Sequence, residues 1–454
     1  MSQPIKAFIT LLLCLAATTT IVSKDWGRPD LEGDEFEKRF TASYGVLSEK
    51  EPPIDELEVQ ILEKLAPMMR VNREYAQTLL ESMTVGDAPR SATFNYLLGN
   101  VYFENDEYFL AEEQYKTAIE KFPDFQRAWT NLGVLKLRSD DTRNALVSFL
   151  KAVELGDTKP STFGMLGYCH FRQGNFISAE VAYDRAMLSE PNNLDWLEGK
   201  AQVYLEADRF AEAIHTQDEL IARRPNDTDY WLAQANAYLA IENLRQAARN
   251  LEIVRSIGKA NFQSLYQLGN LYSNLGLFGP ASDAYLDAAP LAESSDISFL
   301  IAATNVLIRN EQIELAKDLF SKIEITSYPT DSDTRFSYYS IAAEIAYHEG
   351  DLYASIERLE EATQFDPTNG KALVKLARRY IEADKRDKAY LLLDRAERDP
   401  EAEYPAVLTR AKLLIEEKRF SESQPYVARA LKLQSSDSIQ VLYQQVEDAV
   451  RNRD

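Results

Sequence analysis

Apolar and small residues recur along this chain with a fixed period, and polar residues fill the positions between them. Gly99, Gly133 and Gly167 are equally spaced, and a leucine precedes each of them. The apolar residues around each glycine are spaced by three and four, so they share one face of a helix. A period of about 34 residues predicts stacked units of two helices each. The residues that recur with the glycines are Leu98, Leu132, Leu166, Tyr102, Ala111, Ala145, Ala179, Tyr115, Phe149, Tyr183, Ala118, Ala152, Ala186, Pro123 and Pro191.

The chemistry of these positions explains why they recur. A glycine or alanine on the first helix, and an alanine on the second, allow the two helices to approach closely. The aromatic residue four positions after that alanine fills the space between units, and proline or a polar turn then ends the second helix. One helix pair cannot bury its own apolar face, so the units stack and share a continuous core.

This set of residues resembles the tetratricopeptide repeat family, whose pattern is W-x2-L-G-x2-Y…A-x3-F…A…P. The resemblance implies an all-α, right-handed superhelical solenoid of about ten repeats over residues 92–436. Seven of the nine intervals between repeats are equal, and the two on either side of Ile297 are longer. The seventh repeat departs most, since Thr304 replaces the glycine and Leu307 the tyrosine. The first helices are expected to begin at Ala92, Gln126, Pro160, Leu194, Thr228, Phe262, Ile297, Phe336, Gly370 and Tyr404.

The start of the chain reads as a targeting segment. Residues 1–23 carry Lys6 and then a long uncharged run, which predicts a secretory signal peptide or, as the alternative, an uncleaved membrane anchor. Leu13 before Cys14 argues against a lipoprotein signal. We therefore expect an exported, periplasmic protein, or a membrane-anchored one if the segment is retained.

Three further regions flank the repeats. Residues 24–53 are rich in acids, glycine and proline, which predicts a mobile acidic linker. Over residues 54–91 the apolar positions follow a helical period, which predicts a pair of capping helices. Residues 437–454 predict one capping helix at the other end, because an exposed terminal repeat would leave apolar surface in water.

The charge limits the classes of partner. The net charge is −22 at pH 7, and an acidic surface repels nucleic acid, so protein or peptide partners are expected instead. In the ninth repeat Lys371, Lys375 and Arg378 share one helical face. This cluster predicts either solvated helix faces paired with neighbouring acids or a docking point for an acidic partner.

The sequence offers no set of catalytic or metal-binding residues. Its histidines, His170, His215 and His348, belong to different repeats and lie far apart along a stack. No phosphate-binding loop or dinucleotide fingerprint occurs. Cys169 is the only thiol left after signal cleavage, and its place in a helix predicts a buried small apolar residue. We expect no cofactor, no metal ion and no enzymatic activity.

By the family resemblance, the first helices line the concave side of the solenoid. Their second, fifth, sixth, ninth, twelfth and thirteenth positions point inward. The ninth position holds Asn100, Asn236, Asn270 and Asn305. An amide can bond the C=O and the N–H of a peptide together, so the last three predict a ladder that grips an extended backbone. The alternative is that these amides bond within their own repeat.

Other inward positions predict side-chain contacts with a peptide. Tyr266 and Asn274 accompany the asparagine of the sixth repeat, and Tyr96 accompanies that of the first. Asn100 and Asn131 match two positions of the family's carboxylate clamp. Tyr96 stands where the clamp requires lysine, so the clamp itself is not expected.

The sequence thus predicts a non-enzymatic scaffold or adaptor of the cell envelope that binds partner peptides in the concave groove. Two alternatives remain open. One is an assembly or recruitment factor for an outer-membrane or energy-transducing complex, and the other is a membrane-tethered adaptor with an uncleaved anchor. Residues 327–333 lie in the longest interval and predict a longer loop and a hinge.

Overall fold

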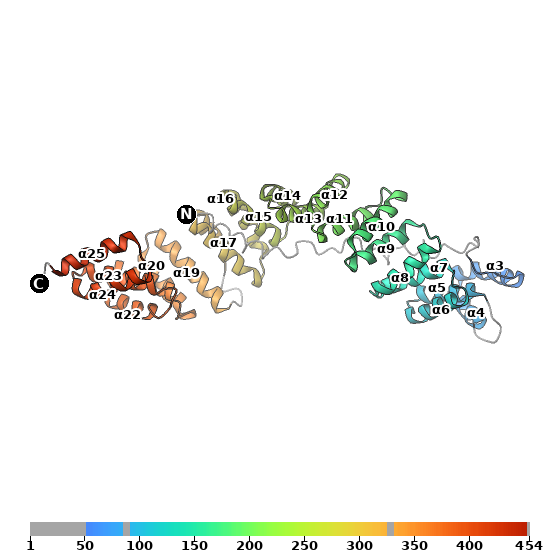
Figure 1. The fold of residues 1–454 in the computed structure, drawn as a ribbon, viewed down its shortest axis with the longest axis horizontal. Coiled ribbons are helices and arrows are strands. Elements are labelled where there is room, and N and C mark those ends of the chain that lie inside the picture. Colours follow the sequence, from blue (N-terminus) through green and yellow to red (C-terminus); the bar gives the residue numbers. More distant parts are fainter. Residues whose placement is uncertain (1–50, 85–90, 325–330, 452–454) are drawn as a thin grey trace. The chain divides into compact units, whose positions relative to one another are not determined.

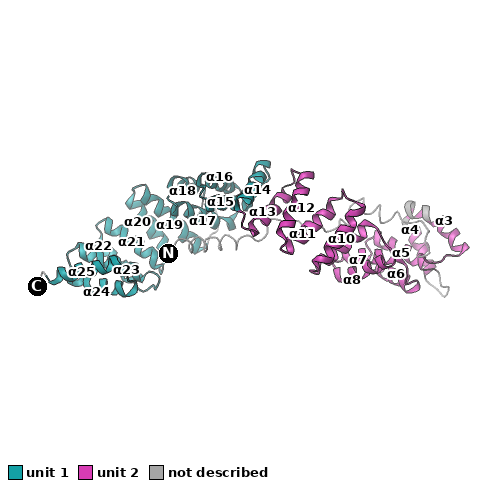
Figure 2. Ribbon diagram, turned by 45° about the horizontal axis from the view of Figure 1, so that its top comes forward, with its two compact units in different colours: residues 1–21, 244–454 teal, residues 22–243 magenta. Residues whose placement is uncertain are grey.

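The computed structural model describes residues 51–84, 91–324 and 331–451, and within these ranges the chain folds into α-helices and short 3₁₀ turns without strands. The expected all-α solenoid is confirmed, because each helix packs chiefly against its neighbours in sequence. The expected signal peptide or anchor, and the linker up to residue 50, lie outside the described residues. The chain divides after residue 243 into two compact units, which we call in chain order the first unit (up to residue 243, magenta in Figure 2) and the second unit (from residue 244, teal in Figure 2).

The first unit contains the expected helix pair before the repeats and then four and a half repeats (Figure 1). Every second helix packs against the helix before it and the helix after it, so the core continues from one pair to the next. The helices are α3 (Glu56–Val71), α4 (Arg73–Thr84), α5 (Ala92–Glu104), α6 (Tyr108–Lys121), α7 (Gln126–Arg138), α8 (Thr142–Glu154), α9 (Pro160–Arg172), α10 (Phe176–Ser189), α11 (Leu194–Glu206), α12 (Phe210–Arg223) and α13 (Thr228–Ala240).

The second unit completes the fifth repeat and adds five more, followed by a single helix. Two 3₁₀ turns, Ala289–Leu291 and Ser294–Asp296, precede the seventh repeat. The helices are α14 (Leu244–Ile257), α15 (Phe262–Asn274), α16 (Phe278–Ala288), α17 (Ile297–Arg309), α18 (Ile313–Phe320), α19 (Ser332–His348), α20 (Leu352–Phe365), α21 (Gly370–Glu382), α22 (Arg386–Ala396), α23 (Glu403–Glu416), α24 (Phe420–Leu433) and α25 (Asp437–Arg451).

Eight of the ten first helices begin at the expected residue. The tenth begins one residue early, and α19 begins at Ser332 instead of Phe336. Asp331 causes this earlier start, because its side chain accepts a hydrogen bond from the backbone N–H of Thr334 and caps the helix. The expected loop over residues 327–333 is therefore wrong at its end: residues 332 and 333 are helical, and residues 325–330 lie outside the described residues.

Each repeat turns between its two helices through one residue with positive φ. The φ angles of these residues lie between 56° for Asp208 and 85° for Gly350. Their spacing repeats the sequence intervals, including the two longer steps, from Gly276 to Glu311 and from Glu311 to Gly350. Such a residue ends a helix in the left-handed conformation, which glycine adopts at the lowest cost. The ten residues are Asp106, Asp140, Gly174, Asp208, Glu242, Gly276, Glu311, Gly350, Asp384 and Lys418.

The glycines of the first helices make room for aromatic rings, as the period predicts. A Cβ atom on Gly99 would lie 2.7 Å from the ring of Tyr115, and one on Gly269 would lie 2.3 Å from the ring of Tyr285. The same contact joins Gly133 to Phe149 and Gly167 to Tyr183. In each pair the ring follows the glycine at the same sequence separation and is fully buried. The glycine therefore decides how deeply the second helix can place its ring.

The last helix packs on α24 and covers the end of the tenth repeat. Ile439 and Val446 are buried against Val407 and Val427 in one cluster. Val441, which the apolar period includes in the buried face, is instead 56% exposed. The α25 helix therefore rests on Ile439 in its first turn and leaves Val441 in solvent.

Candidate peptide-binding surface

In the first two repeats the inward side chains bond to one another. Tyr115 donates a hydrogen bond to Oδ1 of Asn100 at 2.9 Å. The amide nitrogen of Asn131 donates to the same oxygen at 2.8 Å and to the hydroxyl of Tyr96 at 3.2 Å. All four residues are buried, and burial raises the pKa of the Tyr96 phenol above its usual value near 10. For Asn100 and Asn131 this arrangement favours the interpretation in which the amides bond within the solenoid.

The end of the expected linker is packed on this same surface. The Glu51 carboxylate pairs with the guanidinium group of Arg127 on α7, and Arg127 Cζ lies 5.2 Å from the centre of the Tyr96 ring. Pro52 is buried. Glu51, near the end of the expected linker, is therefore paired with the second repeat.

The predicted ladder divides between the two units. Asn236 on α13 is partly buried, and its Oδ1 is shielded from solvent with no hydrogen-bond partner among the described residues. On α15 the Oδ1 of Asn270 accepts a hydrogen bond from Tyr285 at 2.8 Å. Asn305 on α17 is partly exposed, and Asn274 is exposed. The amides of the second unit are thus more accessible than Asn100 and Asn131.

Tyr266 is not positioned as a free aromatic anchor. It is buried, its ring stacks on Phe262 with centroids 5.8 Å apart, and it contacts Phe299 of the next first helix at 5.3 Å. These contacts tie α15 to α17. Tyr266 therefore supports the position of Asn270 and Asn274 and exposes little of its own surface.

The basic cluster of the ninth repeat lies on inward positions of α21, and its charges are paired. Lys371 Nζ lies 2.5 Å from Glu401, and Lys375 Nζ lies 2.6 Å from Glu344 on α19. Arg378 Nε donates to the Thr409 hydroxyl at 3.3 Å. The three basic side chains are nevertheless exposed. Exposed ion pairs contribute only about 0–1 kcal/mol, so a partner carboxylate can replace the internal one.

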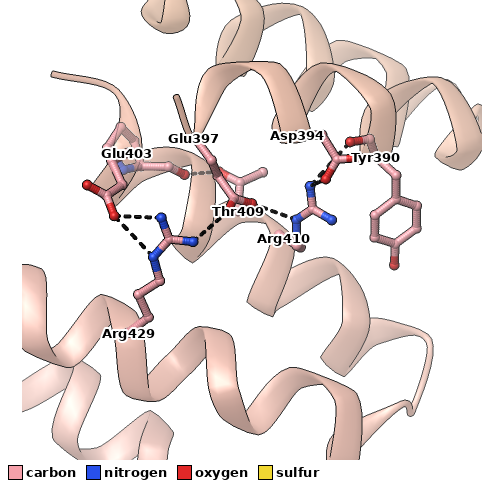
Figure 3. Close-up of polar contacts among 8 residues, drawn as sticks. Tyr390, Asp394, Glu397, Glu403, Thr409, Arg410 and Arg429 are labelled. Atoms are coloured by element: carbon pink, nitrogen blue, oxygen red, sulfur yellow. Dashed lines mark hydrogen bonds and ion pairs between the residues drawn. The ribbon is translucent and has the colours of Figure 1, made fainter. Parts of the chain in front are cut away.

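An ionic network joins the second helix of the ninth repeat to both helices of the tenth (Figure 3). Arg410 on α23 is buried, pairs with Asp394, and places its Nε 2.8 Å from a Glu397 oxygen. The other oxygen of Glu397 lies 2.7 Å from Arg429 on α24, which also pairs with Glu403 at 2.6 Å. Glu397 therefore links two arginines and holds three helices together.

Sequence reasoning missed this network, although a signal for it exists. Arg410 occupies the seventh position of its repeat, where the first repeat has Leu98. Its partner Asp394 precedes it in sequence, on the preceding second helix. The same sequence separation joins Lys200 to Asp184, whose charged atoms lie 2.6 Å apart. A basic residue at the seventh position, with an acid at this separation before it, thus indicates an ion pair between repeats.

The described residues contain no group of three or more side chains that could hold a metal ion. His215 and His348 are exposed, whereas His170 is partly buried, and burial lowers the pKa of its imidazole. Cys169 is fully buried, and burial raises the pKa of its thiol to about 12. The prediction that Cys169 serves as a buried apolar residue is confirmed. Within the described ranges no helix is both long and apolar enough to span a bilayer.

Two stretches of the chain match family models for the tetratricopeptide repeat, namely residues 96–160 and 170–237. Superkiller protein 3 of Schizosaccharomyces pombe is 31% identical over 97 residues, which are 21% of this chain and 7% of that protein. Hsp70-Hsp90 organizing protein 2 of Arabidopsis thaliana is 23% identical over 165 residues, which are 36% of this chain and 28% of that protein. The chain thus spans only a minor part of either relative.

Solved structures resemble the chain in fold. The C-terminal part of a repeat protein from Cytophaga hutchinsonii is 14% identical and covers 55% of this chain and 97% of its own, with a TM-score of 0.42. Yeast Tom70 is 15% identical and covers 80% of this chain and 96% of its own, with a TM-score of 0.33. Repeats of this family mediate protein–protein interactions. The two family matches and the ten helix pairs at the family's spacing identify the chain as a tetratricopeptide repeat protein.

Proposed function

We propose that the chain is a non-enzymatic adaptor that holds extended segments of partner proteins on the inward positions of its later first helices, α15, α17 and α21. One observation carries this proposal. In the second unit these positions present accessible polar side chains, among them Asn274, Asn305, Lys375 and Arg378. In the first repeat the inward positions from Thr93 to Phe103 are buried.

The chemistry of this surface favours an extended, acidic segment. Asn274 and Asn305 each offer a donor and an acceptor to a peptide backbone, and each hydrogen bond contributes about 0.5–1.5 kcal/mol net. Lys375 and Arg378 add charge-assisted bonds to a carboxylate, which are about twice as strong as neutral ones. Several such contacts are needed, which suits a surface that extends over more than one repeat.

We place this adaptor in the cell envelope. The support is the sequence of residues 1–23, with one lysine followed by an uncharged run. A role in assembling or recruiting an envelope complex, and a membrane-tethered form, are alternatives within the same proposal. The mass of the protein purified from its own cells separates cleavage from anchoring, because cleavage removes about two dozen residues.

A cross-linking experiment tests the binding surface. A photo-cross-linking amino acid replaces Ala302, an exposed inward residue of α17, and a second chain carries it at the exposed Val147 of α8 as the control. The first chain is expected to trap one partner protein in cells, whereas the control chain is expected not to. Equal trapping at both positions would contradict the proposal.

Substitutions then separate the two chemistries of the surface. Asn274→Ala with Asn305→Ala removes amides for which the described residues provide no hydrogen-bond partner, so folding is expected to be unaffected. Lys375→Glu with Arg378→Glu reverses the charge of α21. Each pair of changes is expected to lower the yield of the trapped partner about tenfold, which corresponds to the loss of about 1.4 kcal/mol. A yield unchanged in both would mean that this surface does not carry the binding.

A further inference from the structure

The inner face of the first repeat is covered. In α5 every residue from Ala92 to Phe103 is buried, including those at inward positions. Thr93, Leu97 and Phe103 have 8%, 6% and 4% of their surface exposed. On an open concave surface these side chains would lie in water. The inner face of the first repeat is therefore not open to solvent.

The described chain starts on this face. Glu51 pairs with Arg127 at the second, inward position of α7, and little of either side chain is exposed. Pro52, the next residue, is also buried. The polypeptide thus reaches α3 from the inner face of the first two repeats. The segment immediately before Glu51 is the part of the chain closest to this surface by connectivity.

The inner face of the first three repeats combines arginines with aromatic rings. Arg138, at the thirteenth position of α7, places its guanidinium carbon 5.4 Å from the centre of the Phe103 ring. Arg172, at the equivalent position of α9, donates to the Tyr168 hydroxyl at 2.9 Å. Together with Arg127, these residues form a basic and aromatic strip on a chain whose net charge is −22. Such a strip suits a peptide that carries carboxylates and aromatic side chains.

We propose that residues 24–50 bind along the inner face of α5, α7 and α9 of the same chain, and so close this part of the groove to partner proteins. The segment contains seven acidic and four aromatic residues, and five of the acids fall within residues 30–37. Twenty-seven residues can extend to about 90 Å. Neighbouring helices pack about 10 Å apart, so the segment is long enough to cross all three.

This inference is independent of the surface proposed above on the second unit, because it concerns different helices and a different ligand. The occupant is part of the chain, so its local concentration is in the millimolar range. A contact of only micromolar intrinsic affinity would therefore keep the site closed. A partner protein for the first repeats must displace residues 24–50 before it binds.

Peptide binding in trans tests the proposal. A fluorescein-labelled peptide with the sequence of residues 24–50 is titrated with the full chain and with a chain that lacks these residues, and fluorescence anisotropy is recorded. The shortened chain is expected to bind the peptide at least about tenfold more tightly than the full chain, whose site is already occupied. Equal binding by the two chains, or none by a folded shortened chain, would overturn the proposal.

Charge reversal defines the site within that experiment. Arg127→Glu in the shortened chain is expected to weaken peptide binding at least about fivefold, because it repels the acidic residues of the peptide. Arg143→Glu, which makes the same charge change on an exposed residue of α8, serves as the control and is expected to have no effect. Equal loss in both variants would indicate non-specific charge attraction and would contradict the assignment.

A second measurement on the full chain remains decisive even if the shortened chain fails to fold. A p-benzoylphenylalanine residue replaces Phe36, and the cross-links formed in dilute solution are mapped by mass spectrometry. They are expected within one molecule and on residues 92–172. A control with the same amino acid at Phe109, which is 73% exposed on α6, is expected to show no cross-link to residues 24–50. Cross-links to a second molecule, to residues 244–451, or none above this control would overturn the proposal.

Discussion

The first three repeats and the last two fill the same repeat period with different side chains. In the first three, a glycine at the eighth position receives the edge of an aromatic ring from the second helix of the same repeat. In the last two, an alanine takes the place of the glycine, and an aliphatic residue takes that of the ring. The larger residue at the eighth position goes with a smaller one on the second helix, so the constraint acts on the two positions together. The five pairs are Gly99 with Tyr115, Gly133 with Phe149, Gly167 with Tyr183, Ala377 with Leu393 and Ala411 with Val427.

The two regions also differ at their inner faces. The inward positions of the first repeat from Thr93 to Phe103 are buried and carry no charge. Those of the ninth repeat carry the exposed, basic Lys371, Lys375 and Arg378. The same backbone scaffold therefore supports a buried inner face in one region and an accessible charged face in the other. This difference is the reason for proposing partner binding on the later repeats.

The largest expected effect comes from exchanging the packing type of one repeat. Gly99→Ala places a methyl group 2.7 Å from the Tyr115 ring, which is buried and cannot move away, so we expect destabilisation of about 2–3 kcal/mol. Adding Tyr115→Leu converts the repeat to the packing of the ninth. The double variant is expected to be more stable than the sum of the two single changes by about 1–3 kcal/mol. Urea unfolding of all four chains gives this coupling energy.

The control for this cycle is Gly279→Ala. Gly279 lies in the first turn of α16, and a Cβ atom there would meet nothing within 4 Å. We expect this change to stabilise the chain by about 0.4–1 kcal/mol through the unfolded state. Additive effects of the Gly99 and Tyr115 changes would disprove the view that the two positions form one packing unit.

The next largest effect concerns the ionic network of the last repeats. Arg410→Leu restores the residue type of the first repeat but leaves Glu397 and Asp394 without one cation. Removing one partner of a buried ion pair costs about 3–5 kcal/mol. Asp394 is more than half exposed, so we expect a smaller destabilisation of about 2 kcal/mol.

Thermal unfolding in low and high salt checks this prediction. Arg451→Leu removes the ion pair that the exposed Arg451 side chain makes with the partly exposed Glu447 and is expected to change stability by less than about 0.5 kcal/mol. If Arg410→Leu were neutral or stabilising, leucine at the seventh position would serve the last repeats as well as the first. The ionic network would then have no role in holding α22, α23 and α24 together.

The fourth repeat offers a change of intermediate size and opposite sign. Gln217 on α12 follows Ala201 at the separation that joins Gly99 to Tyr115. It is fully buried, and within the described residues neither of its amide atoms has a hydrogen-bond partner. Gln217→Leu gives this repeat the pairing of the ninth. We expect stabilisation of about 1–2 kcal/mol, because the cost of burying an unsatisfied amide is removed.

The melting temperature of the Gln217→Leu chain measures this gain. Gln202→Leu, at a partly exposed position where the amide bonds to Glu206, serves as the control and is expected not to stabilise the chain. A decrease in the melting temperature of the Gln217→Leu chain would show that the buried amide of Gln217 stabilises the fold. A leucine packed against Ala201 would then be unable to replace it.

The repeat architecture could be predicted because each unit must solve the same packing problem. The repeat period predicted the first residue of most first helices, and it identified the aromatic residues whose rings pack against Gly99 and Gly133. The Arg410 network was not predicted, because it depends on three helices meeting around one glutamate. The packing of Glu51 on Arg127 was also not predicted, since the period begins only at residue 92 and carries no information about the chain before it.

The smallest expected effect lies in a feature that the two units share, and it tests whether the units differ only in side chains. Glu242 and Glu311 adopt φ angles of 58° and 62° at equivalent turns of the two units. Replacing either by glycine removes a backbone cost of about 1–2 kcal/mol, and the greater freedom of glycine in the unfolded chain offsets about half of it. We expect each variant to be more stable by about 0.5–1 kcal/mol, as measured by urea unfolding.

The reverse change isolates the backbone term. Gly276 adopts a φ of 73° at the same turn, and a Cβ atom there would meet nothing within 4 Å, so Gly276→Ala is expected to cost about 1 kcal/mol from strain alone. Equal gains for Glu242→Gly and Glu311→Gly would mean that one turn geometry serves both units, and that their differences arise from the side chains packed around it. A gain in only one unit would mean that contacts of the glutamate side chain oppose the strain in the other, and the comparison would then have to include the turns.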